Sequence, residues 1–181
     1  MNIIEVIKSG GVILYPTDTV WGIGGDATNL KVIDKIIKIK KRPLSKSFLI
    51  LVNDYEMLQN YVENIPMEIW ESIEKSVRPT TYIFPNPKNL PDKLLANDGS
   101  IAIRIIKKGF AKELIKAVGV PLISTSANLS ENPVPDSFDN IDKTILQNMD
   151  YVVNLHRKKM TGKPSKIIKW SKENGLEIIR D

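Results

Sequence analysis

Short apolar runs alternate with segments of helical periodicity along the 181 residues, and this alternation limits the possible folds more than any other feature. Phe48–Val52 and Ser100–Ile106 are apolar or alternating runs that are short enough to be strands. Between such runs, Leu30, Ile33 and Ile37 recur at the spacing of one helix face. Strands that alternate with helices predict an α/β fold in which helices cover both faces of a twisted, largely parallel or mixed sheet.

The same patterns place the other elements and predict a single domain over residues 1–181. Further strands are expected at Val12–Tyr15, Thr81–Phe84, Leu122–Ser124, Tyr151–Val153, Ser165–Trp170 and Leu176–Ile179. Helices are expected after Asp54, which can cap the first of them, from Pro66 onward, and over Phe110–Val118. The glycine-rich residues 22–25 and the serine-rich residues 124–130 are expected to form loops after strands.

The residue types that are absent restrict the chemistry. The chain has no cysteine, which excludes disulfides, thiolate nucleophiles and cysteine-ligated zinc. A single histidine excludes a multi-histidine metal site, and this residue, His156, stands among basic neighbours where we expect a solvated loop. We therefore predict no protein-ligated metal, and chemistry that rests on Lys, Arg, Ser, Thr, Asp and backbone amides. These groups suit the binding of anions.

The charge of the chain indicates the same kind of partner. A net charge of +5 and a pI near 9.3 favour phosphate-bearing partners, either a nucleotide or RNA, although a merely basic surface would give the same values. No apolar run approaches the roughly 18 residues that span a membrane. The N-terminus also lacks the basic start and cleavage site of a signal peptide. We predict a cytoplasmic protein without membrane association.

Two candidate clusters follow the first predicted strand and the first long helix. Thr17 and Thr19 offer hydroxyl groups where a buried strand ends, which is the usual position of ligands in open α/β sheets. The alternative is a tight turn that uses the following glycines for its backbone conformation. Lys40 and Arg42 stand at a helix end, just before Pro43. They could clamp a phosphate or carboxylate, or simply interact with the helix dipole.

Two further clusters lie on or beside later strands. Ser124, Ser126 and Asn128 belong to a run of hydroxyl and amide side chains that could bind a nucleotide or satisfy the local backbone. Arg104 interrupts an isoleucine-rich strand, so it needs an anionic partner if that strand is buried on both faces, and points to water if the strand is at an edge. The other polar candidates on or beside strands are Ser100, Ser165 and Arg180.

Taken together, three segments resemble the YrdC-like family of threonylcarbamoyl-AMP synthases: GGVILYPTDTVWGIGGDATN, KKRPLSKSFLILV and STSAN. Weaker similarity extends from about Gly10 to Arg180. The resemblance implies a YrdC-like fold with a basic central cavity. It also implies that L-threonine, bicarbonate and ATP react to threonylcarbamoyl-adenylate and pyrophosphate, with Mg²⁺ bound through the phosphates. A threonylcarbamoyl transferase complex would then use this product to modify tRNA.

The resemblance also implies roles for individual residues. Threonine would be bound by Thr19, Arg104, Ser124 and Ser165. ATP would be bound by Lys40, Arg42, Ser100, Ser126, Asn128 and Arg180, of which Lys40 and Arg42 are the expected catalytic residues.

Three segments depart from the family pattern. One is Leu155–Lys159, which lacks the usual acidic and glycine-rich turn. Val77–Thr81 replaces a Pro-Gly-Pro-Leu-Thr stretch, and Lys166 follows Ser165 where the family has threonine. A lysine beside a threonine-binding serine could alter that pocket. The departures and the net charge leave room for a non-catalytic paralogue that binds double-stranded RNA, tRNA or a nucleotide. They also leave room for an enzyme that acts on another carbamoyl or acyl-adenylate substrate.

Overall fold

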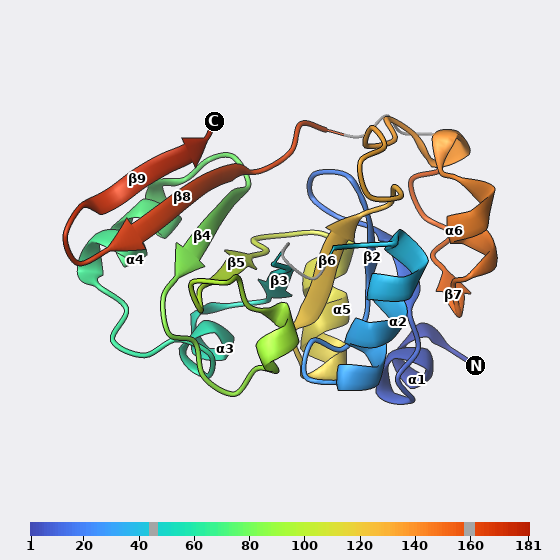
Figure 1. Ribbon diagram of the computed structural model, residues 1–181, viewed down its shortest axis with the longest axis horizontal. Coiled ribbons are helices and arrows are strands. Elements are labelled where there is room, and N and C mark those ends of the chain that lie inside the picture. The colour runs from blue at the N-terminus through green and yellow to red at the C-terminus, as the bar shows by residue number, and fades with distance from the viewer. Residues whose placement is uncertain (44–46, 158–161) are drawn as a thin grey trace.

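The computed structural model describes residues 1–43, 47–157 and 162–181, and one sheet runs through these ranges (Figure 1). The order of its strands is β7-β1-β2-β6-β3-β5-β4-β8-β9. The strands are β1 (Ile13–Pro16), β2 (Trp21–Gly24), β3 (Leu49–Val52), β4 (Thr80–Phe84), β5 (Ile101–Ile105), β6 (Leu122–Ser126), β7 (Tyr151–Val152), β8 (Lys166–Ser171) and β9 (Gly175–Arg180).

The sheet mixes parallel and antiparallel strands. The pairs β1–β7, β3–β5 and β4–β8 are parallel, whereas β1–β2, β2–β6, β3–β6, β4–β5 and β8–β9 are antiparallel. Antiparallel neighbours can be joined by a short turn, and residues 17–20 make such a turn between β1 and β2. The predicted mixed α/β sheet is confirmed.

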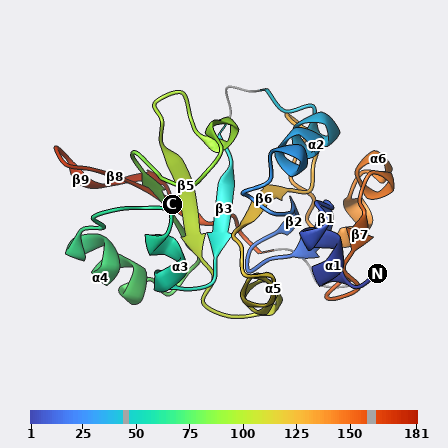
Figure 2. The same ribbon diagram turned by 90° about the horizontal axis from the view of Figure 1, so that it is seen from below.

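Helices lie on both sides of this sheet. They are α1 (Ile3–Lys8), α2 (Leu30–Lys40), α3 (Tyr55–Gln59), α4 (Met67–Lys75), α5 (Phe110–Val118) and α6 (Lys143–Gln147), with 3-10 turns η1 (Asp92–Leu94) and η2 (Phe138–Asn140). Figure 2 shows α2 on one side of the sheet and α5 on the other. One apolar layer joins the sheet to α2, α3 and α4, and a second joins it to α1 and α5. Within the described ranges, no helix combines the length and the apolar character that crossing a membrane requires.

Two of the predicted loops are wrong. Trp21–Gly24 is strand β2, and residues 124–126 belong to strand β6, so that Gly22 pairs with Ser126. Glycine and serine have low strand propensity, so the local pattern favours a loop, and pairing with neighbouring strands overrides it. The helix that Asp54 was expected to cap is α3, and it ends at Gln59. The short helices α1 and α6 were not predicted.

Gly24 lies where two backbones come too close for a side chain. A Cβ atom on this residue would lie 2.1 Å from the carbonyl oxygen of Ile123 and 2.8 Å from Cε1 of Tyr15. We expect Gly24→Ala to lower the free energy of unfolding by about 3 kcal/mol, because strand β6 or the Tyr15 ring must move. Urea denaturation measures this change.

Gly119→Ala is the matched control for that substitution. A Cβ atom on Gly119 would meet nothing within 4 Å, and only its φ of 77° disfavours a side chain. The cost of that backbone conformation is about 1–2 kcal/mol. Equal losses of stability in the two variants would contradict a steric role for Gly24.

The sheet face that packs against α1 and α5 also carries polar residues. Arg104 in β5 is in register with Leu51 of β3, and Ser124 in β6 is in register with Leu49. Both leucines pack in the apolar layer with α5. Residues in register on neighbouring strands share a face. Two of the predicted threonine-binding residues therefore lie on one side of the sheet.

Candidate functional site

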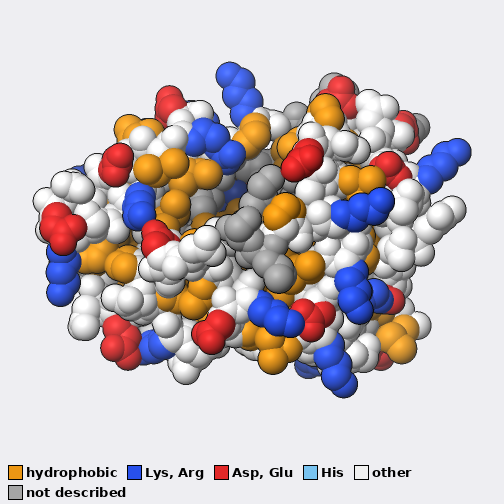
Figure 3. Space-filling model, viewed as in Figure 1, with side chains coloured by type: hydrophobic (Ala, Val, Ile, Leu, Met, Phe, Trp, Pro, Cys, Tyr) orange, Lys and Arg blue, Asp and Glu red, His pale blue; other side chains and the backbone are white. Residues whose placement is uncertain are grey.

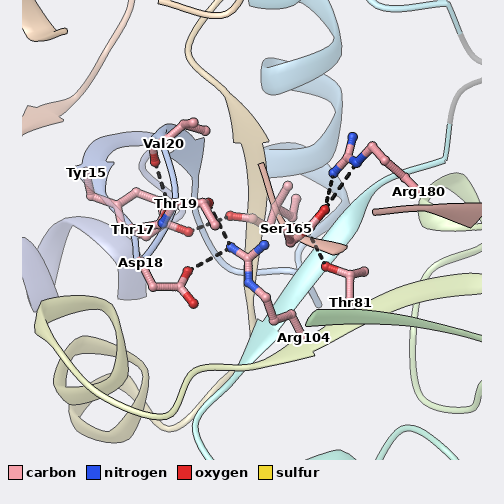
Figure 4. A network of polar contacts seen from close by, with 10 residues as sticks. Tyr15, Thr17, Asp18, Thr19, Val20, Thr81, Arg104, Ser165 and Arg180 are labelled. Carbon is pink, nitrogen blue, oxygen red and sulfur yellow. Dashed lines mark hydrogen bonds and ion pairs between the residues drawn. The ribbon is translucent and has the colours of Figure 1, made fainter. Parts of the chain in front are cut away.

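Arg104 is a buried cation on a central strand. The residue is only 2% exposed, as for a strand buried on both faces, so we expect it to have an anionic partner. Its Nη2 lies 3.0 Å from Oδ1 of Asp18 and donates a 3.4 Å hydrogen bond to Oγ1 of Thr19. Figure 4 shows the guanidinium reaching from β5 toward the β1–β2 turn. Because an unpaired buried charge is costly, Asp18 is a partner that the fold requires.

The β1–β2 turn is held together by the hydroxyl group of Thr17. Its Oγ1 donates to the carbonyl of Val20 at 2.7 Å and accepts from the amide of Thr19 at 3.1 Å. The same oxygen lies 3.0 Å from Oγ1 of Thr19. Local hydroxyl-to-backbone bonds of this kind stabilise one turn conformation. The turn therefore holds Asp18 and the buried Thr19 beside Arg104.

Ser165 is a polar residue of the site that comes from the β8–β9 edge of the sheet. It precedes β8, is 4% exposed, and its Oγ lies 2.9 Å from Oγ1 of Thr81. Its carbonyl oxygen accepts hydrogen bonds from Arg180, at 3.1 Å from Nε and 2.8 Å from Nη2. Figure 4 shows Arg180 extending from β9 toward Ser165. Strands β4, β8 and β9 thus bring two hydroxyl groups and a second guanidinium to the site.

The surroundings of Arg104 favour an additional anionic group. Burial lowers the pKa of Arg104 and the nearby Arg180 lowers it further, whereas Asp18 raises it. Nε of Arg104 is buried and has no hydrogen-bond partner among the described residues. A buried donor without an acceptor costs about 1–3 kcal/mol. A carboxylate or phosphate oxygen that accepts a hydrogen bond from Nε would satisfy this demand.

Lys40 forms the centre of a second cluster, at the end of α2. It is 1% exposed, and its Nζ donates to the carbonyl oxygens of Ser126 and Asn128, each at 2.5 Å. Nζ also lies 3.4 Å from Oδ1 of Asn128, which accepts a hydrogen bond from the hydroxyl of Ser126. The structure therefore brings three of the predicted nucleotide-binding residues together, and Lys40 holds the segment that follows β6.

Arg42 stands two residues further on and stays close to Lys40. Its Nη2 donates to the carbonyl of Ser47 at 2.5 Å, and its guanidinium carbon lies 4.7 Å from the ring centroid of Phe48. Burial lowers the pKa of Arg42. Lys40 and Arg42 are thus two cations held near each other and partly removed from water. A bound phosphate would offset the repulsion between their charges.

The burial of Lys40 should make the free energy of unfolding depend on pH. Burial, followed by the charge of Arg42, lowers the pKa of Lys40 from 10.5 to about 7. Between these values the unfolded chain binds a proton that the folded protein does not, so the free energy of unfolding should rise with pH, by up to about 1.4 kcal/mol per pH unit. We expect this rise from pH 7 to about pH 9 in urea denaturation at constant ionic strength. Lys40→Met should lack it, and parallel curves for the two proteins would contradict the assignment.

Ser100 and Ser124 occupy two other predicted positions. Ser100 directly precedes β5, and both its hydroxyl and its amide donate to Oδ1 of Asp98. Hydrogen bonds from Ser100 and from Lys169 lower the pKa of Asp98 to about 2. Ser124 is buried near Tyr15, whose pKa is raised by burial and whose hydroxyl donates to the carbonyl oxygen of Ile123 at 3.1 Å. Ser100 is thus engaged in a turn, and its role toward a nucleotide stays a prediction.

Two of the departures from the family pattern meet at the end of β9, whereas Lys158 and Lys159 of the third lie outside the described residues. Nη1 of Arg78 and Nζ of Lys166 both lie 3.3 Å from Oδ1 of Asp181. Successive side chains of a strand point to opposite faces, and this ion pair holds the ammonium of Lys166 away from the hydroxyl of Ser165. The substitutions therefore form a partly exposed ion-pair cluster outside the Ser165–Thr81 contact.

Two cavities border these groups. One, of about 470 Å³, is lined by the turn residues Thr17, Asp18 and Thr19 and by the N-terminal end of α5. His156 is exposed, as predicted, but it also borders this cavity. The other cavity, of about 420 Å³, begins at Asn128 and is lined by residues between 127 and 142. Each cavity therefore adjoins one of the two polar clusters.

The sequence analysis missed three residues of the site: Asp18, Thr17 as the residue that holds the turn, and Thr81. Asp18 could have been found, because a buried arginine requires an acid and Asp18 lies between two threonines already singled out. Thr81 carried no signal. Its contact with Ser165 joins residues 84 positions apart, and only the parallel pairing of β4 with β8 brings them together.

The mixed sheet defines a protein of the α/β class, and its site combines the Lys40 cluster with a buried Arg104 whose Nε has no partner among the described residues. The family model Sua5_yciO_yrdC, described as "Telomere recombination", matches residues 5–181. The chain belongs to this family.

Relatives and solved structures agree with that membership. The threonylcarbamoyl-AMP synthase of Pseudoalteromonas translucida (strain TAC 125) is 37% identical over 130 residues, which are 70% of each chain. Escherichia coli YciO shares the fold with a TM-score of 0.83 at 22% identity, over 98% of this chain and 86% of that one. Sua5 of P. abyssi complexed with L-threonine has a TM-score of 0.84 at 21% identity. The match covers 98% of this chain, which spans about half of that Sua5.

Proposed function

We propose that the protein is a threonylcarbamoyl-AMP synthase, which joins L-threonine, bicarbonate and ATP into threonylcarbamoyl-adenylate and releases pyrophosphate. The observation that carries the proposal is the buried guanidinium of Arg104, whose Nε lacks an acceptor beside Thr19 and Arg180. The P. translucida relative named threonylcarbamoyl-AMP synthase and the threonine complex of P. abyssi Sua5 support it.

Threonine would be bound on the sheet face that carries Arg104. The carboxylate of the substrate would accept a hydrogen bond from Nε of Arg104, which satisfies the buried donor. Thr19 and Ser165 are both less than 9% exposed and offer hydroxyl groups to the substrate. Ser124, on the same face, completes the proposed set of threonine-binding residues.

ATP would be bound by the cations and amides of the second cluster. Lys40 and Arg42 would contact phosphates, and Asn128 borders a cavity of about 420 Å³ that can accept another part of the nucleotide. Ser100, Ser126 and Arg180 are the further nucleotide-binding residues of the proposal. Among the described residues, no three His, Asp or Glu side chains gather as metal ligands. Mg²⁺ would therefore take its ligands mainly from the phosphates.

The proposed reaction needs positioning and charge more than a nucleophilic side chain. The threonine amine would combine with bicarbonate to form a carbamate, with loss of water. The carbamate oxygen would attack the α-phosphate, and pyrophosphate would leave. Fixed cations stabilise the charge that develops in such a transfer and hold the reactants together. The product would pass, in the cytoplasm, to a transferase complex that modifies tRNA.

The test is a pyrophosphate assay with purified protein, ATP, Mg²⁺ and bicarbonate. Release of pyrophosphate should depend on added threonine, and serine or valine in its place should give much less. Release without amino-acid dependence, or none under conditions where the P. translucida relative is active, would overturn the proposal. Equal rates with another amino acid would instead favour a different carbamoyl- or acyl-adenylate substrate.

The net charge of +5 favours a second candidate, a protein that binds tRNA or double-stranded RNA without turnover. On the face shown in Figure 3, the coloured Lys and Arg side chains are interspersed with Asp and Glu and form no continuous stripe. That distribution gives RNA weaker support than the buried cations give a small anionic substrate. Tight, salt-sensitive tRNA binding without threonine-dependent pyrophosphate release would reverse the ranking.

A further inference from the structure

Asp18 is a carboxylate at the centre of the proposed threonine site. Its Oδ1 lies 3.0 Å from Nη2 of Arg104, and its side chain is 19% exposed, against 3% for the arginine. The turn that carries it is held by the bonds of Thr17 to the backbone of Thr19 and Val20. Asp18 is therefore fixed next to a buried guanidinium and still accessible to a small solute.

Asp18 also borders two cavities. It lines the cavity of about 470 Å³ together with Thr17 and Thr19. It lines a further cavity of about 370 Å³ together with Thr80, Tyr82 and Ile105. The carboxylate that borders both cavities is thus the one that contacts Arg104.

The guanidinium of Arg104 can hold a second carboxylate without displacing Asp18. Asp18 and Thr19 both use Nη2, which carries two hydrogens, and Nε is buried without a partner among the described residues. The site would then hold an arginine cation for one end of a ligand and an aspartate anion beside it. An α-amino acid carries a carboxylate and an ammonium group on the same carbon, and matches this arrangement of charges.

Asp18 differs from the other paired acids. In the ion pairs of the described residues, Asp34, Asp98, Asp150 and Asp181 pair with side chains that are between 24% and 48% exposed. Only the pair of Asp18 with Arg104 involves a cation that is almost fully buried. Exposed pairs contribute little to stability or recognition, whereas a desolvated pair does more.

We propose that Asp18 recognises the α-ammonium group of the amino-acid substrate while Arg104 binds its carboxylate. This inference rests on the proposed function and adds a specificity-determining residue to it. Asp18 acts here by binding, and no covalent bond is made or broken. The arrangement selects a zwitterion over a simple carboxylic acid, because a ligand without the ammonium group leaves Asp18 with only its arginine partner.

The test compares threonine with 3-hydroxybutyrate, which keeps the carboxylate and hydroxyl and lacks the amino group. Calorimetric titration of wild-type protein should show 3-hydroxybutyrate binding about 10- to 100-fold more weakly, as expected for one charge-assisted hydrogen bond. Asp18→Asn should bind threonine more weakly and reduce the affinity ratio of the two ligands to near one. Asp92→Asn, the same chemical change at an exposed position, should leave the ratio at the wild-type value.

The outcomes separate this inference from the proposed function. If wild-type protein binds threonine and 3-hydroxybutyrate equally, Asp18 does not recognise the ammonium group, and this result does not depend on any variant folding. An unchanged ratio in folded Asp18→Asn protein, checked by its thermal melting, overturns the inference as well. If threonine neither binds nor supports pyrophosphate release in wild-type protein, the proposed function itself fails.

Discussion

Arg104→Lys should reduce threonine-dependent pyrophosphate release about 100-fold or more. Lysine keeps the positive charge but offers a single point of contact, whereas the guanidinium can donate from Nη2 to Asp18 and Thr19 and from Nε to the substrate at the same time. Truncating one partner of a desolvated charge pair costs about 2–5 kcal/mol, and about 3 kcal/mol corresponds to a factor near 100. The loss should fall mainly on the KM for threonine, because Arg104 is assigned to the carboxylate and not to ATP.

Steady-state kinetics with each substrate varied in turn measures this split. Arg78→Lys is the control, since Arg78 makes a partly exposed ion pair with Asp181 and should tolerate the change with less than about a twofold effect. A threonine KM within threefold of wild type in folded Arg104→Lys protein would contradict the role of the buried guanidinium. A loss confined to the KM for ATP would move Arg104 to the nucleotide.

Lys40→Met should lower kcat about 100-fold while threonine binding, measured by titration, changes little. Methionine fills a similar volume, so the main losses are the ammonium charge and its hydrogen bonds to the carbonyls of Ser126 and Asn128. Removing one fixed charge or donor from a transferring group typically costs about a factor of 100 to 1000. The segment that carries Asn128 also loses the contacts that hold it.

Lys38→Met controls for a general effect on α2, because Lys38 is exposed on the same helix. It should retain near wild-type kcat. If Lys40→Met also kept kcat within threefold, the ammonium would have a structural role only. Lys40 would then affect the pH dependence of the free energy of unfolding but not catalysis. If Lys40→Met lost threonine binding as strongly as kcat, the separation into two clusters would be wrong.

The two variants together test a division of the site that the contacts suggest. Arg104 is joined to Thr19 and Asp18, whereas Lys40 is joined to Ser126 and Asn128. Ser124, of the first group, lies two residues before Ser126, of the second, so strand β6 connects the two groups. Losses confined to one substrate in each variant would support the division.

The amino-acid sequence by itself determined the class of fold and the kinds of side chain in the candidate site. Alternating short apolar runs and helical periodicity specify a mixed α/β sheet, because each pattern matches the repeat of only one kind of element. The absence of cysteine and the single histidine restrict the chemistry to cations, hydroxyls and amides. The types of residue in the candidate site, including Arg104 and Lys40, were therefore evident before their positions were known.

Only the tertiary structure decided which of these residues meet. Arg104 reaches Thr19 across 85 positions and Lys40 reaches Ser126 across 86. Such contacts depend on the order of strands in the sheet, and local periodicity carries no information about that order. The same reason explains why β2 was not predicted: it is a strand because it pairs with β1 and β6. Gly24 suits that strand because the carbonyl of Ile123 in β6 leaves no room for a Cβ atom, a requirement that no neighbour in the chain reveals.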